Sequence, residues 1–274
     1  MNNYLIMGVL NVTPDSFSDG GQFVSVDRAI RQALLMVSEG AHIIDVGGES
    51  SRPGAQAISA SEELDRVAPV IEKLSQAVDV RISVDTRKYE VACDAVSLGA
   101  TLLNDISGGA DLRMAQLACA GELDVILMHM NGEPGTMQLS PEYPEGVVPE
   151  VKRFLRDRVR AFEEVGVAPE RIWVDPGIGF GKQLGDNLEL LDRIGEFSDL
   201  AGRVVVGTSR KSFLATVLEE ANLPMDLRRE GTLASNLWAY QNGATVFRVH
   251  DVGPLARALK TWDAIRGTRR HSPR

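Results

Sequence analysis

The chain has 274 residues, of which 44% are hydrophobic and 24% are charged, and its formal net charge is −9. These values are typical of one soluble α/β domain and exclude disorder along the whole chain. The negative charge disfavours nucleic acid as a partner, because the two would repel each other. An anionic substrate would need a local cluster of Arg, Lys and helix N-termini.

Short apolar runs alternate with segments of helical periodicity along the chain. The runs are rich in Ile, Val and Leu, as in strands buried on both faces of a parallel sheet. The expected strands cover residues 4–10, 42–46, 81–84, 101–103, 124–128, 171–174, 203–206 and 245–249. Eight strands alternating with helices predict an α/β fold, a single (βα)8 TIM barrel, with an open doubly wound sheet as the alternative.

The segments between these runs carry helix signals. Apolar residues recur with helical spacing over 30–37, 64–71 and 151–165, and Ser59 with Glu62 predicts a capping box. A glycine closes a helix before four of the strands, where it would adopt the left-handed conformation. These glycines are Gly40, Gly99, Gly166 and Gly243.

The connections that follow strands include three long ones, at 13–26, 47–60 and 130–149, whereas those that lead back to strands are short. Long loops in a compact domain are usually functional. We therefore expect one domain over residues 1–265 with its active site at the C-terminal rim of the strands. Residues 266–274 are expected to form a basic, mobile tail.

Neither the N-terminus nor the cysteines indicate secretion or a membrane span. MNNYLIMGVL lacks the basic start of a signal peptide, and no apolar run reaches membrane length. Cys93 and Cys119 lie in Ala-rich helical stretches, where we expect two buried, reduced thiols. We therefore predict a cytoplasmic protein.

Polar residues end every expected strand. Asp85, Asn104 and Asp175 could bind the edge of a flat heterocycle, because a carboxylate accepts adjacent N–H groups and an amide both donates and accepts. Helix capping is the alternative for each and is most credible for Asp105. A rim with this many polar strand ends favours catalysis over structure.

Arg248 and His250 are two residues apart, so both should point to the same side of a strand. With Asn11 and the helix start after the seventh strand they could hold an anion, and Arg210 and Lys211 add positive charge. DPGIGFGK at 175–182 matches neither common phosphate-loop pattern, and its glycines could let backbone approach a flat ligand. Nucleophilic and zinc chemistry are disfavoured.

The motifs together resemble the dihydropteroate synthase family over almost the whole chain. The matching segments, in order, are MGVLNVTPDSFSDGG, IIDVGGESSRPGA, SVDT, LNDISGG, MHM, DPGIGFGK, GTSRKSF and RVHDV. The resemblance implies a transferase of folate biosynthesis that condenses 6-hydroxymethyl-7,8-dihydropterin pyrophosphate with 4-aminobenzoate. It also implies Mg2+ as cofactor, a homodimer, and sulfonamides as competitive inhibitors.

The family's site residues map onto positions of this sequence. The resemblance assigns the pterin to Asp85, Asn104, Asp175 and Lys211. It assigns pyrophosphate to Asn11, Arg248 and His250, with Asn11 also a magnesium ligand. It assigns 4-aminobenzoate to Phe17, Ser51, Arg52, Pro53, Phe180, Lys211 and Ser212. The residues expected to act in catalysis are Asp85, Lys211, Arg248, His250 and Asn11.

Two residues depart from the family's usual pattern. Ser51 stands where Thr is usual, which keeps the hydroxyl and slightly enlarges the pocket, and Asn131 stands where Gln is common. The first rival is a pterin-binding methyltransferase, which would not need Arg248, His250 or the GTSRKSF segment. The second is a degenerate barrel kept for interaction, which the presence of Asp85, Lys211 and Arg248 disfavours.

Overall fold

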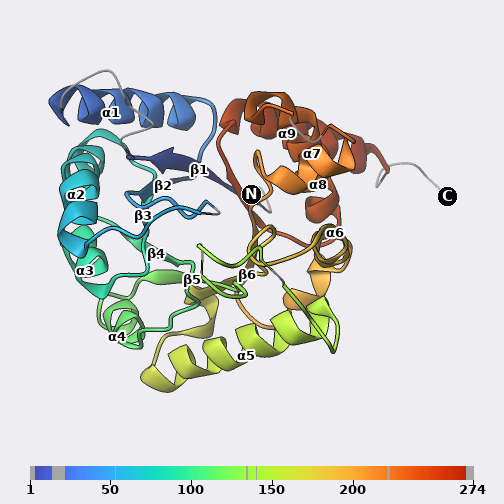
Figure 1. The fold of residues 1–274 in the computed structure, drawn as a ribbon. Coiled ribbons are helices and arrows are strands. Elements are labelled where there is room, and N and C mark those ends of the chain that lie inside the picture. The colour runs from blue at the N-terminus through green and yellow to red at the C-terminus, as the bar shows by residue number, and fades with distance from the viewer. Residues whose placement is uncertain are drawn as a thin grey trace.

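The computed structural model describes residues 4–13, 22–52, 54–133, 135–139, 141–220 and 223–269. Within these residues, eight parallel strands pair in sequence order and close into a barrel (Figure 1). They are β1 (Leu5–Asn11), β2 (Ile43–Gly47), β3 (Arg81–Asp85), β4 (Leu102–Asp105), β5 (Asp124–Met128), β6 (Ile172–Asp175), β7 (Arg203–Val206) and β8 (Val246–Val249). The predicted TIM barrel is confirmed, and the open sheet is excluded because β1 pairs with β8.

Helices surround the barrel in Figure 1. They are α1 (Gln22–Ser38), α2 (Ala60–Ala77), α3 (Tyr89–Ser97), α4 (Arg113–Ala120), α5 (Val147–Val165), α6 (Leu184–Asp192), α7 (Ser212–Val217), α8 (Arg229–Gln241) and α9 (Val252–Arg269). Short 3-10 turns are η2 (Pro169–Arg171), η3 (Ile194–Phe197) and η4 (Met225–Arg228). None of the helices in the described part of the chain is long and apolar enough to span a membrane.

The local signals account for where several helices begin and end. The Ser59 side chain accepts a hydrogen bond from the Glu62 backbone N–H at 3.1 Å, as predicted for the start of α2. The Glu62 carboxylate pairs with Arg66. All four predicted capping glycines have a positive φ, between 107° and 116°. Glycine pays no side-chain penalty in this region, so each helix can turn sharply into the next strand.

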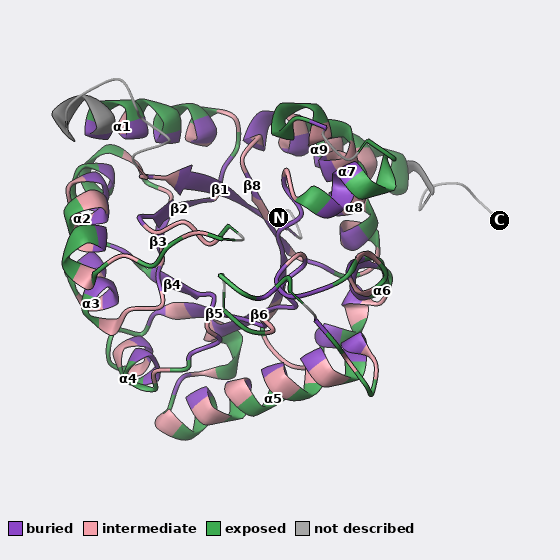
Figure 2. Cartoon of the chain, in the orientation of Figure 1, coloured by how far each residue is buried: buried purple, intermediate pink, exposed green. Residues whose placement is uncertain are grey.

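Two apolar layers stabilise the barrel. The larger core lies between the strands and the inward faces of the helices, as the burial colours of Figure 2 show. The smaller one comprises Met7, Ile43, Leu102, Ile126, Trp173, Val205 and Val246. Both faces of every strand except β3, whose interior residue is Ser83, therefore contribute apolar groups, which explains why the strands are nearly continuous apolar runs.

Some boundaries differ from the sequence prediction. Several strands run one residue further than expected and so include the polar residue that follows the apolar run. The first long loop is shorter than predicted, since α1 begins at Gln22. Helix α9 continues to Arg269, four residues past the expected domain end at residue 265. Cys93 and Cys119 are free, as expected, but each is only half-buried.

Candidate active site

A polar layer lies directly above the small apolar layer inside the barrel. Side chains alternate along a strand, so a residue two positions after an interior residue also faces the interior. On β2, β4, β6 and β8 the interior residues Ile43, Leu102, Trp173 and Val246 are each followed at this spacing by a polar residue: Asp45, Asn104, Asp175 and Arg248. On β3, Asp85 follows the buried Ser83. The two-residue period of the strands therefore brings these polar side chains together inside the barrel.

Arg248 stands at the centre of this layer. Its Nε donates to Asp45 Oδ2 at 2.7 Å and its Nη2 donates to Asp85 Oδ2 at 2.5 Å. Asn104 Nδ2 donates to the same Asp45 oxygen at 3.1 Å. The structure thus joins Asp85 and Asn104, expected at the heterocycle, with Arg248, expected at the anion. We call these four residues the Arg248 cluster.

Burial controls the charges of the Arg248 cluster. The Asp85 side chain is 11% exposed, and burial raises its pKa to about 7 although Arg248 opposes the shift. Burial works against the charge on Arg248, but Asp45 and Asp85 raise its pKa above the ordinary value. Asp45 is fully buried, and its Oδ1 has no hydrogen-bond partner among the described residues. The guanidinium therefore stays charged, whereas Asp85 can change protonation state near neutral pH.

Asp175 and Lys211 form the opposite side of the layer. Asp175 Oδ1 accepts a hydrogen bond from the Gly177 N–H at 2.7 Å, and Lys211 Nζ donates to the Ile178 carbonyl. The ammonium lies 4.3 Å from the centre of the Phe180 ring, within cation–π distance. Burial lowers the pKa of Lys211 to about 8 against the influence of Asp175. Burial also raises the pKa of Asp175, and Lys211 opposes that shift.

Lys182 fixes the β6–α6 loop against the end of β5. Its buried Nζ lies 3.0 Å from His129 Nδ1 and donates to the Phe180 carbonyl at 2.9 Å. Burial lowers the pKa of Lys182 to about 7 and that of His129 to about 3. Gly177 has a φ of +71°, and a Cβ there would lie 1.9 Å from the His129 carbonyl oxygen. Only glycine fits this close approach, so the loop conformation depends on it.

His250 directly follows β8, two residues after Arg248. Its Nδ1 is 3.0 Å from Ser209 Oγ. Burial lowers the pKa of His250 to about 3, and the nearby cations Arg248, Arg210 and Arg52 lower it further. The imidazole is therefore neutral in this arrangement.

The positive charge that Arg210 adds near His250 is paired with an acid. Its guanidinium forms a two-point ion pair with Asp251, with N–O distances of 2.8 and 3.1 Å. Its backbone has a φ of +62°, and Arg228 donates to its carbonyl at 3.0 Å. Asp105 likewise has a structural role, because its carboxylate accepts hydrogen bonds from Ser107 and Gly109 in the turn after β4.

The remaining predicted residues are distributed around the rim. Asn11 is the last residue of β1 and pairs with Gly47 in the sheet register. Ser51 and Arg52 lie in the β2–α2 loop, and Arg52 is close enough to His250 to influence its pKa. Ser212 is the exposed first residue of α7. Phe17 and Pro53 lie outside the described residues.

Comparison with known proteins places this geometry in a family. A model of the pterin binding enzyme family matches residues 7–250. A dihydropteroate synthase of Synechocystis sp. is 44% identical, and the match covers 95% of this chain and 89% of that protein. The chain belongs to the dihydropteroate synthases.

Solved structures of the family have the same fold. A Yersinia pestis dihydropteroate synthase in complex with a sulfonamide drug superposes with a TM-score of 0.90 at 41% identity, covering 97% of this chain and 96% of that one. A Xanthomonas albilineans dihydropteroate synthase with 4-aminobenzoic acid gives 0.89 at 39% identity, covering 98% and 94%. As a dihydropteroate synthase, the chain is a transferase.

Two residues of the rim were not singled out from the sequence of this dihydropteroate synthase. Asp45 lies inside the expected strand 42–46, and its two-residue spacing from Ile43 places it on the interior face with Arg248 and Asn104. Lys182 was seen only as the end of a glycine-rich segment. No sequence signal reports its contact with His129, because the two lie 53 residues apart.

Proposed function

We propose that this synthase joins the methylene carbon of a dihydropterin pyrophosphate to the amino nitrogen of 4-aminobenzoate, giving 7,8-dihydropteroate and pyrophosphate. The C–O bond to pyrophosphate breaks, and its electron pair leaves with the phosphate oxygen. The arylamine nitrogen then forms the new C–N bond and loses a proton. The observation that carries the proposal is the Arg248 cluster, which brings carboxylates and a cation together in the polar layer inside the barrel.

The pterin ring would be bound by the carboxylates and the amide of the polar layer. Asp85, Asn104 and Asp175 offer acceptors and a donor for the N–H groups and nitrogens of the ring edge, and Lys211 supplies a further donor. Departure of pyrophosphate leaves positive charge on the pterin methylene. Buried carboxylates close to the ring would stabilise that charge, because they are fixed in a medium of low polarity.

Pyrophosphate would be held by Arg248 and His250 with Asn11. Arg248 has more N–H donors than its bonds to Asp45 and Asp85 use, so it can also donate to phosphate oxygens. His250 is neutral without an anion, and a bound phosphate would favour its protonated form. Proton transfer from His250 to the departing oxygen would then help the C–O bond to break.

Magnesium fits the residues at this rim, with Asn11 as the protein ligand. Asn11 ends β1 at this rim, and its side chain carries an amide oxygen that could serve as a ligand. The described residues contain no group of three or more His, Cys, Asp or Glu that could hold a metal by themselves. Mg2+ is commonly bound by one or two protein oxygens together with substrate phosphates. It would neutralise charge on the leaving pyrophosphate.

4-Aminobenzoate would bind between the β2–α2 loop and the β6–α6 loop. Arg52 could pair with its carboxylate, Ser51 and Ser212 could donate hydrogen bonds, and Phe180 with Lys211 would form the wall toward the pterin. Phe17 and Pro53 complete the proposed set, outside the described residues. Sulfonamides resemble this amine in shape and charge, so we propose that they compete with it.

A homodimer is also proposed. Large apolar side chains are exposed from the end of α7 through η4 to α8, namely Val217, Leu218, Met225, Leu227 and Trp238. An isologous contact would bury this surface on both copies. We further propose a cytoplasmic location, since the two cysteines are free thiols.

The direct test incubates the purified protein with dihydropterin pyrophosphate, radiolabelled 4-aminobenzoate and Mg2+. Labelled dihydropteroate is expected, and its formation should stop when EDTA removes the metal. A complete lack of product would refute the synthase proposal, and full activity in EDTA would refute the magnesium proposal.

Variants of Lys211 test the site assignment. Lys211→Ala should weaken the binding of both substrates, because the ammonium lies between Asp175 and Phe180. Arg171→Ala, which removes an ion pair with Glu122 at the opposite end of β6, serves as the control and should keep normal kinetics. Unchanged kinetics in Lys211→Ala would contradict the assignment.

A further inference from the structure

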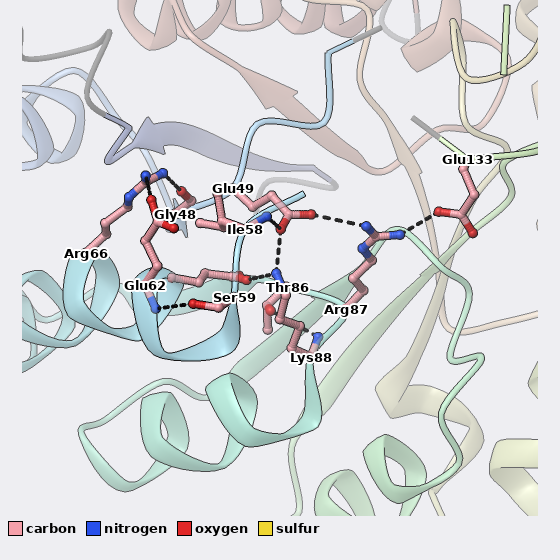
Figure 3. Close-up of polar contacts among 11 residues, drawn as sticks. Gly48, Glu49, Ile58, Ser59, Glu62, Arg66, Thr86, Arg87, Lys88 and Glu133 are labelled. Atoms are coloured by element: carbon pink, nitrogen blue, oxygen red, sulfur yellow. Dashed lines mark hydrogen bonds and ion pairs between the residues drawn. The ribbon is translucent and has the colours of Figure 1, made fainter. Parts of the chain in front are cut away.

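A series of ion pairs connects three loops on one side of the rim (Figure 3). Lys88 Nζ contacts Glu49 Oε2 at 2.5 Å and also contacts Glu63. Arg87 lies between two acids, with its Nη2 3.4 Å from Glu49 and its Nη1 2.6 Å from Glu133. We call these five residues the rim network. It links the β2–α2 loop, the start of α2, the β3–α3 loop and the β5–α5 loop.

Glu49 closes the β2–α2 loop at its base. Its Oε2 accepts a hydrogen bond from the Ile58 N–H at 3.1 Å, so the two ends of the segment are joined. Arg66 of α2 donates to the Gly48 carbonyl at 2.8 Å and fixes the same end. The segment in between contains Ser51 and Arg52. The position of the Glu49 carboxylate therefore affects the position of the loop proposed to bind 4-aminobenzoate.

Glu133 connects the rim network to the opposite wall of the proposed pocket. It begins the turn that leads to Gln138, whose Nε2 donates to the Gly179 carbonyl at 2.6 Å. Further along the same loop, the Tyr143 hydroxyl donates to the Gly181 carbonyl at 2.7 Å. These two contacts bracket Phe180. Among the described residues, Arg87 thus pairs with both the β2–α2 loop, through Glu49, and the β5–α5 loop, through Glu133.

The two cations of the rim network differ in what they do for the fold. Lys88 neutralises Glu63, which is 1% exposed, so its loss would leave a buried, unpaired carboxylate and destabilise the protein. Arg87 instead pairs with Glu133, which is 69% exposed, and with Glu49, which keeps Lys88 as a second cationic partner. Exposed pairs of this kind contribute little to stability. The Arg87–Glu133 pair consequently needs another explanation, and its position between two loops supplies one.

We propose that Arg87 is a positioning residue for the second substrate. It holds the β2–α2 loop at a fixed distance from the β5–α5 loop and so sets the width of the pocket for an aromatic amine with a carboxylate. Arg87 touches neither substrate in this proposal. The inference rests on the proposed function, since it assumes that the amine binds between these loops.

The test compares Arg87→Ala with Arg171→Ala, which also loses pairs with one exposed acid, Glu122, and one largely buried acid, Asp124, at the other end of the barrel. In Arg87→Ala the KM for 4-aminobenzoate at saturating pterin substrate should rise about ten-fold, which corresponds to about 1.4 kcal/mol. The Kd of dihydropterin pyrophosphate, measured by calorimetry, should change less than about two-fold, and the thermal midpoint should match that of Arg171→Ala. An unchanged KM, or an equal loss for both substrates, would overturn the proposal.

A double-mutant cycle separates positioning from a local effect of Arg87 itself. Glu133→Gln should also raise the KM for 4-aminobenzoate, and the double variant Arg87→Ala/Glu133→Gln should be no worse than Arg87→Ala alone. Additive effects would contradict a shared action through the Arg87–Glu133 pair.

A measurement without turnover keeps this inference distinct from the proposed function. Backbone amides of residues 54–58 should exchange hydrogen faster in Arg87→Ala than in the unmodified chain, whereas Arg171→Ala should leave them unchanged. If the unmodified chain makes no dihydropteroate, the proposed function fails while this measurement still decides whether Arg87 holds the loop. Equal exchange in all three proteins would refute the role of Arg87.

Discussion

Replacing Arg248 by methionine should destabilise the protein in a pH-dependent way. The substitution keeps an unbranched side chain but removes the only cation in contact with the fully buried Asp45 and the nearly buried Asp85, as far as the described residues show. Breaking a buried ion pair costs about 3–5 kcal/mol. The Arg248 side chain is 22% exposed, which allows some hydration, so we expect about 3 kcal/mol, near the lower limit.

The sign of the pH dependence follows from Asp85. Its pKa in the folded protein, about 7, is above that of an unfolded chain, so the stabilising effect of its bound proton is lost as pH rises through 7. Removing Arg248 should raise this pKa further, and the variant should then keep losing stability above pH 7. Relative to the unmodified protein the extra loss is at most about 1.4 kcal/mol per pH unit.

Thermal unfolding at pH 7, 8 and 9 measures both effects. A loss of about 3 kcal/mol corresponds to a midpoint lowered by about 6–12 °C for a chain of this size. The gap between Arg248→Met and the unmodified protein should widen from pH 7 to pH 9. Arg153→Met, which removes an exposed pair with Glu145, is the control and should shift little at any pH. A gap that is absent, or constant over this range, would refute the account of the Arg248 cluster.

The pH profile of activity and the β6–α6 loop provide two further predictions. The kcat/KM for the pterin substrate should rise as Asp85 ionises near pH 7 and fall as Lys211 loses its proton near pH 8. In Lys211→Arg the fall at alkaline pH should move above about pH 9. If the fall stays at the same pH in this variant, a group other than Lys211 causes it. Gly177→Ala should lower kcat/KM about a hundred-fold, since its Cβ would clash with the His129 carbonyl and shift the loop. Gly40→Ala has a similar left-handed backbone without this clash and should retain activity, so equal activity of the two variants would contradict the argument.

The sequence predicted the barrel well because each strand carries its own signal. Two strands, Asp124–Met128 and Arg203–Val206, begin and end where the apolar runs do. Others extend by one residue, as β3 does to Asp85, because backbone pairing continues after the apolar pattern stops. The polar residue there adds nothing to hydrophobic periodicity, so periodicity alone underestimates the strand.

The sequence predicted which residues lie at the rim but not which of them contact one another. The period of two predicts Arg248 and His250 on one side of a strand, but β8 ends at Val249 and His250 lies just past it. Whether Arg248 pairs with Asp85, Asp45 or Asp175 depends on how eight strands are staggered around a closed barrel, and a single strand contains no information on this. The same limit hides the pairing of Arg210 with Asp251, since both residues look available in the sequence.

The charges of the rim suit a reaction in which an anion leaves and a cation remains. Three buried or nearly buried carboxylates, Asp45, Asp85 and Asp175, face the cations Arg248 and Lys211 in the described part of the site. A bound pyrophosphate would compete with Asp85 for the guanidinium and so weaken the pair. In the proposed mechanism, Arg248 would return to Asp85 when pyrophosphate departs, and the acids would remain close to the positively charged pterin. Because the surrounding protein is strongly acidic, this local exchange, rather than the overall field, has to provide the affinity for the anion.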